Sequence, residues 1–512
     1  MDFNSTAETK RFNVILSLIH VEALIVDSKP KFNWELLLRI NDFCGVSWLI
    51  NMEQNMEYKG YREKGLEILK RFGVKVWSDV KIETIKGSFE GLILPRSSTE
   101  DAEHIVIKMK SGYNTGIHVD NITNIKQVGY REGKYKIPEK EFPTDPKKPN
   151  VTLLGTGGTI ASRLDYTTGA VIPAFSPGEL YGAVPELADV CNLKTKKLFG
   201  VFSENMGPTQ YKVLAEEIGN EIRNGADGIV IGHGTDTMHH TASILSFMVQ
   251  NTPVPIILVG SQRSSDRPSS DAARNLLNAT YAAAHSDIAE IMVCMFGPTS
   301  DDYDLLHPGT RVRKMHSSYR STFRTIGDIP IAMIWPDRYV PLRKYNKRRT
   351  DRNVSIDTAY EEKVAILYYY PNMLPDMVNS LVDNGYKGIV IAGTGLGHVN
   401  AALNPSLKRA IEKDVIVVMT VQTLWGYVHM NVYDTGRYLL ELGIIPCENM
   451  LPETAYMKLC WVLGRTKGTK KVKEMMLTPI ADEITPREPH NGYLIYQGGI
   501  PEVERFLAAY KK

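Results

Sequence analysis

Two segments rich in glycine and hydroxyl groups could carry out chemistry. The first, LGTGGTIAS, places Thr159 in a turn where glycine amides can come close to a ligand. The second, GHGTDTMHH, puts Thr235 and Asp236 at the expected start of a helix, where aligned N–H groups favour an anionic substrate group. A threonine oxygen can attack a carbonyl carbon while backbone N–H groups stabilise the oxyanion. The two segments therefore indicate nucleophilic catalysis on a carbonyl substrate.

Each of these residues, taken alone, also has a purely structural explanation. Threonine and aspartate are ordinary helix N-caps. Tyr166 could accept a proton if a loop brings its phenol over Thr159, or it could be a surface tyrosine. Lys314, in HPGTRVRKMHSSYRSTF, could be a solvated surface charge. A dinucleotide site is a weak alternative, because Ile160 replaces the last glycine of the G-x-G-x-x-G fingerprint.

Neither the histidines nor the cysteines form a recognisable metal or disulfide pattern. His233, His239 and His240 match no familiar zinc-ligand spacing, so we expect no metal site. The five cysteines include no C-x-x-C pair, and most lie in apolar surroundings. We therefore expect reduced cysteines in the core of a cytoplasmic protein.

A third polar segment, GSQRSSDRPSSDAARN, follows another apolar run. Its hydroxyls and charges, with Arg263 and Asp271 among them, could bind a polar substrate or form a hydrogen-bonded buttress. The buttress is the preferred interpretation.

The elements around these segments alternate between strand and helix patterns. From residue 151 onward, near-continuous apolar runs such as GIVI at 228–231 and IILV at 256–259 are separated by helical patterns. Such runs are typical of parallel strands that are covered on both faces. They predict an α/β fold with crossover connections, in which ligands bind beyond the carboxyl ends of the strands. The chemically suggestive segments follow strands of this kind.

The rest of the chain predicts further units. Residues 56–135 contain a charged helical segment and then four or five short alternating strands, which predict a small antiparallel β-barrel. A Pro-rich linker follows at 136–150, and the large lobe with the catalytic residues is predicted at 151–342. A smaller lobe and a tail are predicted at 361–512. Residues 1–55 are interpreted as an appendage, or as sequence before the true start of translation.

A basic segment, RKYNKRRTDR, lies within the predicted interlobe linker at 343–360. Its cations could touch the phosphates of an RNA, although a solvated linker is the preferred interpretation. The formal charge of the whole chain is only +2, so any contact with RNA should be local. No apolar run is long enough for a membrane span, and the start of the chain lacks the layout of a secretory signal.

Taken together, the first two segments resemble the signatures of the L-asparaginase family. That family has a T-G-G-T-I-A block after its first strand and an H-G-T-D-T block after a later one, and this chain has both, at 156–161 and 233–237. The resemblance implies a two-lobed fold of parallel sheets and the hydrolysis of a side-chain amide. It also implies that Thr159 is the nucleophile and that Tyr166, on a lid, helps to activate it.

The same resemblance implies roles for further groups. Thr235, Asp236 and Lys314 match the family's second threonine, its substrate-binding aspartate and the lysine joined to both. Two residues of FSENM match the positions that bind the α-carboxylate and α-amino ends of the substrate: Ser203 and Glu204. The backbone amides of Gly158 and Thr235 are candidates for the oxyanion hole. Which threonine attacks first stays open.

One branch of the family is a closer match, the D subunits of archaeal glutamyl-tRNA(Gln) amidotransferase. Simple asparaginases lack a barrel before the first block, and the segments SENM, QRSSDRPSSDA, VRKMH, GTGLGH, MNVYDTGR and MLPETAYMKLCWVLG resemble that branch. The resemblance implies that glutamine or asparagine donates the amide. It also implies a partner E subunit, which receives the ammonia and uses ATP and Mg²⁺ to amidate glutamate on tRNA(Gln), so that the assembly is a carbon–nitrogen ligase. This chain is expected to bind no cofactor, and to meet tRNA mainly through the partner.

The resemblance further implies a homodimer within a heterotetramer, because sites of this family form across a dimer. Two alternatives share part of the evidence: a free-standing cytoplasmic asparaginase, and a non-catalytic scaffold that only assembles a complex. The scaffold predicts that catalytic side chains are missing, whereas all four are present. The predicted barrel favours the amidotransferase subunit over the free enzyme.

Overall fold

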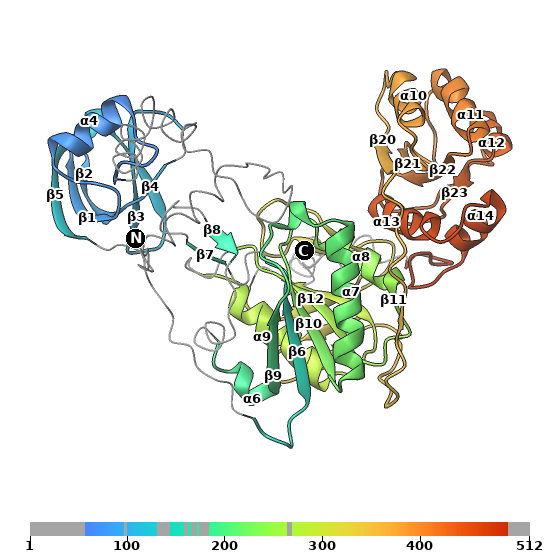
Figure 1. Ribbon diagram of the computed structural model, residues 1–512, viewed down its shortest axis with the longest axis horizontal. Helices are drawn as coiled ribbons and strands as arrows, with labels where there is room; N and C mark the ends of the chain where they lie inside the picture. Colours follow the sequence, from blue (N-terminus) through green and yellow to red (C-terminus); the bar gives the residue numbers. More distant parts are fainter. Residues whose placement is uncertain are drawn as a thin grey trace, which may run out of the picture.

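Three groups of elements make up the described part of the chain (Figure 1). The computed structural model describes these stretches: 57–96, 100–130, 144–157, 184–263, 269–298 and 300–489, with the backbone of 162–164 and 171–173. The proposed appendage at 1–55 and most of the Pro-rich linker lie outside these stretches. None of the helices within them combines the length and the apolar character that a bilayer crossing requires.

The first group is a five-stranded antiparallel sheet with the order β4-β3-β2-β1-β5. Its elements are α4 (Glu63–Arg71), β1 (Ser78–Thr84), β2 (Gly87–Ile93), β3 (His104–Met109), β4 (Asn114–His118), the 3-10 turn η1 (Val119–Asn121) and β5 (Ile122–Tyr130). Alternate residues of β1, such as Val80 and Ile82, are fully buried in one apolar cluster with Ile105 and Ile107 of β3. The predicted small antiparallel unit is therefore present, with β4 and β5 as the two ends of the sheet order.

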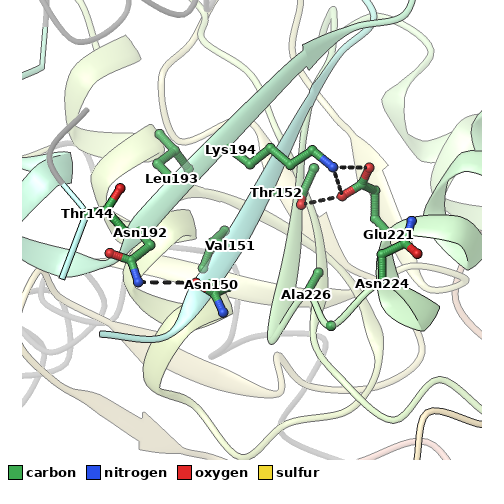
Figure 2. Close-up of a pocket in the computed structure, with 11 residues that line it drawn as sticks. Thr144, Asn150, Val151, Thr152, Asn192, Leu193, Lys194, Glu221, Asn224 and Ala226 are labelled. Atoms are coloured by element: carbon green, nitrogen blue, oxygen red, sulfur yellow. Dashed lines mark hydrogen bonds and ion pairs between the residues drawn. The ribbon is translucent and has the colours of Figure 1, made fainter. Parts of the chain in front are cut away.

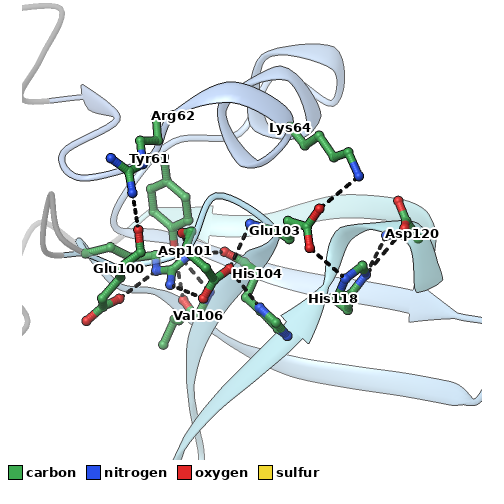
Figure 3. Close-up of polar contacts among 11 residues, drawn as sticks. Tyr61, Arg62, Lys64, Glu100, Asp101, Glu103, His104, Val106, His118 and Asp120 are labelled. Carbon is green, nitrogen blue, oxygen red and sulfur yellow. Dashed lines mark hydrogen bonds and ion pairs between the residues drawn. The ribbon is translucent and has the colours of Figure 1, made fainter.

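Polar contacts hold the loops of this sheet to its helix (Figure 3). The hydroxyl of Tyr61 donates to the carbonyl of Leu94 at 2.9 Å and accepts the amide of Val106 at 3.1 Å. Lys64 of α4 pairs with Glu103 at 3.0 Å, a contact between exposed side chains. Since exposed pairs contribute little, the apolar cluster holds the unit together and the polar contacts set the position of the loops.

The second group is an eight-stranded mixed sheet, the first lobe, with the order β18-β17-β14-β13-β12-β10-β6-β9. Its strands are β6 (Asn150–Gly155), β9 (Asn192–Lys197), β10 (Gly228–Gly232), β12 (Ile256–Val259), β13 (Ile291–Phe296), β14 (Asp304–Pro308), β17 (Ala332–Ile334) and β18 (Tyr339–Pro341). Pairing is parallel from β9 to β13, as the apolar runs predict, and antiparallel from β13 to β18.

Helices cover both faces of this sheet (Figure 1). They are α6 (Leu187–Val190), α7 (Pro208–Arg223), α8 (Met238–Met248) and α9 (Ala272–His285). Because side chains alternate along a strand, Ile229 and Ile231 of β10 pack in the cluster of α7 and α8, whereas Val230 packs in the cluster of α9. All residues of β10, β12 and β13 are buried, which explains their continuous apolar character.

Short hairpins and turns complete the first lobe. The hairpins are β7 (Ser162–Leu164) with β8 (Val171–Pro173) and β15 (Val312–Lys314) with β16 (Phe323–Thr325), and the turn is η3 (Ser203–Asn205). In addition, β11 (Val249–Gln250) forms an antiparallel pair with the distant β19 (Ser355–Ile356).

The third group, the second lobe, is a four-stranded parallel sheet with the order β20-β21-β22-β23. Its elements are β20 (Val364–Tyr368), α10 (Asp376–Asp383), β21 (Gly388–Gly393), the turn η4 (Ala401–Leu403), α11 (Asn404–Glu412), β22 (Ile416–Val421), α12 (Asp434–Leu442), β23 (Ile445–Pro446), α13 (Pro452–Leu463) and α14 (Thr469–Leu477). Helix α13 packs against α8 of the first lobe, where the rings of Phe247 and Trp461 stack at 5.9 Å. The two lobes therefore share one apolar core.

The basic segment between the lobes is solvent-accessible along its length, as expected of a linker, but it is also attached to the first lobe. Residues 343–356, here called the strap, end in β19, which pairs with β11. Four arginines of the strap donate hydrogen bonds to the first lobe: Arg343 to Asp328, Arg348 to Ala283, Arg349 to Asn251 and Arg352 to Ala226. These guanidinium groups attach the strap to the first lobe by donating hydrogen bonds to its backbone carbonyls and to a carboxylate.

The cysteines within the described part of the chain are free and buried, as expected: Cys191, Cys294, Cys447 and Cys460. Burial raises the pKa of Cys447 and of Cys460 to about 12, so both thiols stay protonated and unreactive near neutral pH.

Candidate active site

The two sequence motifs meet at the carboxyl edge of the parallel sheet. Strands β6 and β10 are neighbours, and their last residues, Gly155 and Gly232, lie opposite each other. Thr156, the first residue of the T-G-G-T-I-A block, binds the carbonyl of Gly232 through its amide at 3.0 Å and its hydroxyl at 2.9 Å. The start of the first block is thereby attached to the strand that leads into the second.

Gly157 allows the first block to leave its strand. Its backbone has φ +123°, and a Cβ there would lie 2.2 Å from the carbonyl oxygen of Val201. Only glycine fits both the conformation and the space. The next residues, Gly158 and Thr159, lie outside the described residues, as does Tyr166.

Thr235, Asp236 and Lys314 form one hydrogen-bonded group. Lys314 Nζ donates to Thr235 Oγ1 at 2.9 Å and to Asp236 Oδ1 at 2.7 Å. The Lys314 side chain is 9% exposed and that of Asp236 is 70% exposed. The lysine therefore lies beneath the surface while the carboxylate reaches outward, where a ligand can meet it.

Ser203 and Glu204 lie at the same edge of the sheet. The hydroxyl of Thr237 donates to the carbonyl of Ser203 at 2.6 Å, and Ser203 is buried whereas Glu204 is exposed. A Cβ at Gly234 would lie 2.8 Å from the Cβ of Ser203. The H-G-T-D-T block and the FSENM segment are thus in direct contact, as roles at one site require.

His233 supports this turn and has no metal-ligand arrangement. Its Nδ1 hydrogen bonds the carbonyl of Gly234 at 2.7 Å, and its Nε2 the hydroxyl of Thr241 at 2.9 Å. Burial lowers the pKa of His233 to about 4, so the ring is neutral and can accept the hydroxyl proton of Thr241. Within the described ranges, no group of three or more His, Cys, Asp or Glu side chains could hold a metal ion.

The segment after β12 supports the site as a buttress in the part that the structure describes. Buried Asp271 accepts the amides of Gln262 at 2.9 Å and Arg263 at 2.9 Å. Gly260 lies against Thr235, since a Cβ there would be 2.9 Å from the Thr235 methyl group. Asn275 donates to the carbonyl of Gly260 at 2.9 Å. These contacts fix the position of the backbone that packs against Thr235.

The sequence did not predict the ion pair that attaches the strand of Lys314 to the second lobe. The neighbouring Arg313 pairs with Glu453 of α13 at 2.8 Å, and Glu453 is only 3% exposed. Arg313 and Lys314 project to opposite sides of β15, because side chains alternate along a strand. The MLPETAYMKLCWVLG segment contains this glutamate but carries no local signal of its distant partner.

A pocket of about 290 Å³ lies at the opposite edge of the first lobe (Figure 2). Asn150 and Asn192, the first residues of β6 and β9, line it. Lys194 pairs with the buried carboxylate of Glu221 at 2.7 Å, and Thr152 donates to the same carboxylate at 2.9 Å. Since its charges are already paired and it lies at the amino ends of the strands, this pocket is separate from the motifs.

Three family models match the chain, and their order follows the three groups of elements. A GatD N-terminal domain model matches residues 74–128. An asparaginase N-terminal model matches 150–346, and a glutaminase/asparaginase C-terminal domain model matches 363–476.

Curated relatives decide between the branches of this superfamily. The D subunit of glutamyl-tRNA(Gln) amidotransferase from Pyrococcus furiosus is 50% identical over 438 residues, which cover 84% of this chain and 99% of that protein. The corresponding protein of Methanopyrus kandleri is 48% identical over 437 residues, covering 84% of this chain and 95% of that protein. The chain belongs to the GatD family, the D subunits of glutamyl-tRNA(Gln) amidotransferase. The three family models together match the antiparallel sheet and both lobes of this GatD family member.

Solved asparaginases share the two lobes of this GatD family member. The thermostable L-asparaginase from Thermococcus kodakarensis aligns with a TM-score of 0.59 at 30% identity, covering 66% of this chain and 99% of that one. A probable cytoplasmic L-asparaginase from Campylobacter jejuni aligns with a TM-score of 0.55 at 29% identity, covering 65% of this chain and all of that one. The asparaginase-like fold with a small antiparallel sheet before it is therefore as predicted.

Proposed function

We propose that this chain is the glutaminase subunit of a tRNA-dependent amidotransferase. It hydrolyses the side-chain amide of glutamine or asparagine and delivers the ammonia to a partner subunit. The observation that carries the chemistry is the position of Lys314, whose amine binds both Thr235 and Asp236 at a sheet edge shared with the T-G-G-T-I-A block.

The hydroxyl of Thr159 attacks the amide carbon, ammonia leaves, and water then hydrolyses the acyl-threonine ester. Because Lys314 donates to the Thr235 oxygen, the hydroxyl hydrogen of Thr235 points away from the lysine and is available to the reacting groups. Proton exchange with Lys314 would then pass through Thr235. The amides of Gly158 and Thr235 stabilise the oxyanion, and Tyr166 assists Thr159.

Charge at the site suits an amino-acid substrate. One carboxylate oxygen of Asp236 accepts a hydrogen bond from Lys314. The other carboxylate oxygen is then available to the α-amino group of the substrate. Ser203 and Glu204 complete the recognition of the α-carboxylate and α-amino ends. A neutral side-chain amide then reaches toward Thr235.

Synthesis of the tRNA product requires the partner. An E subunit takes the ammonia, uses ATP and Mg²⁺ to activate glutamate esterified to tRNA(Gln), and forms the new amide. In this assignment the chain itself binds no cofactor, and two copies join two E subunits in a heterotetramer. The likeness to subunits named for glutamyl-tRNA(Gln) amidation supports this role over that of a free asparaginase.

The decisive experiment measures ammonia release by the purified chain with and without its E subunit and glutamate-charged tRNA(Gln). We expect glutamine hydrolysis that these partners stimulate, and no hydrolysis by Thr159→Val. Thr235→Val should lose at least about 100-fold in kcat, because a catalytic hydroxyl of this kind contributes 10²–10⁴-fold, whereas Thr235→Ser should retain most of it.

Other outcomes separate the alternatives. Fast asparagine hydrolysis that partner and charged tRNA leave unchanged would indicate a free asparaginase. Full activity of Thr159→Val would show that another group attacks, and inactivity of the intact chain under all these conditions would indicate a scaffold.

A further inference from the structure

A second cluster of basic residues lies on the second lobe, away from the arginines of the strap. Five basic residues lie within nine positions of the second lobe, and the segment 464–475 holds Glu474 as its single acidic residue. We call them the basic surface: Arg465, Lys467, Lys470, Lys471 and Lys473. All five are exposed.

Among the described residues, one member of the basic surface has an ion-pair partner. Arg465 pairs with Asp357 at 2.9 Å, and its guanidinium lies over the ring of Trp461 at 4.4 Å. The four lysines have no ion-pair partner among the residues that the structure describes. With a net charge of only +2 over the whole chain, this surface is a local excess rather than part of a general basic character.

Two of these lysines lie near the N-terminal end of a helix, where acidic side chains are normally favoured over basic ones. Helix α14 begins at Thr469, and its first turn contains no acidic residue and no capping side chain. Lys470 and Lys471 lie in the first turn of this helix, at the positive end of the helix dipole, where cations are unfavourable by roughly 0.3–1 kcal/mol each. A partner that brings negative charge to this surface would relieve the repulsion among the lysines and the repulsion between the lysines and the helix dipole.

The helix that carries the lysines is firmly seated. Val472 and Met476 are fully buried in the core shared by the two lobes. Buried Lys458 donates to the carbonyls of Met476 at 2.9 Å and Thr478 at 2.7 Å, which anchors the end of α14. The basic surface is therefore preformed, so binding does not require the helix to fold.

We propose that the basic surface binds the phosphate backbone of tRNA. This inference rests on the proposed function, in which tRNA is the polyanion that must reach the complex. Separate lysines are point charges that neutralise phosphates without reading bases, so the contact would position the RNA and carry no sequence specificity. Most recognition would still come from the E subunit.

The test compares two triple variants of the full chain. Lys470→Gln/Lys471→Gln/Lys473→Gln removes three charges from the basic surface. Lys387→Gln/Lys408→Gln/Lys413→Gln removes three charges from exposed lysines elsewhere in the same lobe, as a matched control. Binding of fluorescent tRNA(Gln) is followed by anisotropy between about 50 and 200 mM salt, where each lost phosphate contact lowers the slope of log K against log salt by roughly 0.7–0.9.

We expect the first variant to bind tRNA about tenfold more weakly at low salt, with a slope smaller by about two, and the control to match the intact chain. Equal binding by the intact chain and the first variant, equal weakening in both variants, or no binding of tRNA by the intact chain would overturn the inference. Loss of E-subunit binding with unchanged tRNA binding would assign the surface to a protein instead. Glutamine hydrolysis without tRNA, measured in parallel, tests the proposed function separately.

Discussion

Arg313 donates a hydrogen bond to the buried carboxylate of Glu453 at 2.8 Å, and this ion pair ties the strand that carries Lys314 to the second lobe. The hydroxyl of Tyr368 lies 3.2 Å from the same guanidinium. Strand β15 has only three residues, so little within the strand itself holds it in place. The position of the Lys314 amine therefore depends on packing between the two lobes.

Replacing Glu453 should impair both stability and turnover. Glu453→Gln leaves the half-buried guanidinium of Arg313 without its counter-charge, which costs roughly 3 kcal/mol of unfolding free energy. We expect kcat for glutamine to fall while KM changes little, because Lys314 moves relative to Thr235. Urea unfolding and steady-state kinetics measure the two effects.

A double variant separates turnover from folding. Arg313→Met/Glu453→Leu removes both charges and should recover most of the stability, since apolar replacement of a whole buried pair is often neutral. We expect its kcat to stay low, because the directional contact to β15 is gone. Recovery of kcat together with stability would mean that the pair acts only through folding.

Gly157→Ala should reduce turnover far more than Gly225→Ala. Both glycines have positive φ, +123° and +97°, so alanine at either site is strained by about 1–2 kcal/mol. Only at Gly157 would the new Cβ meet backbone, 2.2 Å from the Val201 carbonyl oxygen, whereas a Cβ added at Gly225 would have no non-neighbouring atom within 4 Å. A shift of the T-G-G-T-I-A block by about 1 Å predicts a loss of about 100-fold in kcat. Similar kcat values for the two variants would contradict this role of Gly157.

Acid should destabilise the first lobe below about pH 6.5, the ordinary histidine pKa. Burial lowers the pKa of His307 to about 3, so the unfolded chain binds this proton and the folded chain does not between pH 6.5 and 3. The stability that this group contributes is therefore complete above pH 6.5 and is lost as the pH falls toward 3, on the order of 5 kcal/mol in total. In His307→Asn, the midpoint of urea unfolding should depend less on pH between pH 6.5 and 4 than it does in the intact chain. The exposed His285→Gln should leave this pH dependence unchanged. An unchanged slope in His307→Asn would show that the ring does not contribute.

The buried Asp304 should act in the opposite direction. Burial raises its pKa to about 7, so the folded chain keeps a proton that the unfolded chain releases near pH 4. Its stabilising contribution is complete below pH 4 and is lost as pH rises through 7. Asp304→Asn, neutral at every pH, should raise the unfolding free energy at pH 8 by roughly 1–3 kcal/mol relative to the intact chain. The exposed Asp337→Asn serves as the control, and a decrease at pH 8 would mean that the Asp304 anion is stabilised by its neighbours.

The core strands and the motif positions were predictable because their causes are local. β10, β12 and β13 are continuous apolar runs, since both faces of each strand are covered, and the motifs follow such runs directly. Strand β9, NLKTKK, was not predicted, because it is an edge strand with a polar pattern and takes its conformation from pairing with β6. The antiparallel strands β14, β17 and β18 were also not predicted. Each has only three to five residues, which is too short for a clear strand pattern.

By itself, the sequence determined the identity and order of the reactive side chains, the α/β character of both lobes and the presence of a small antiparallel unit before them. Tertiary structure alone decided which partners those side chains meet. Arg313 and Glu453 are 140 positions apart, and the strap arginines reach carbonyls up to 126 positions away. Burial and hydrogen bonding across such separations depend on where the chain returns, and no local pattern of residues records that.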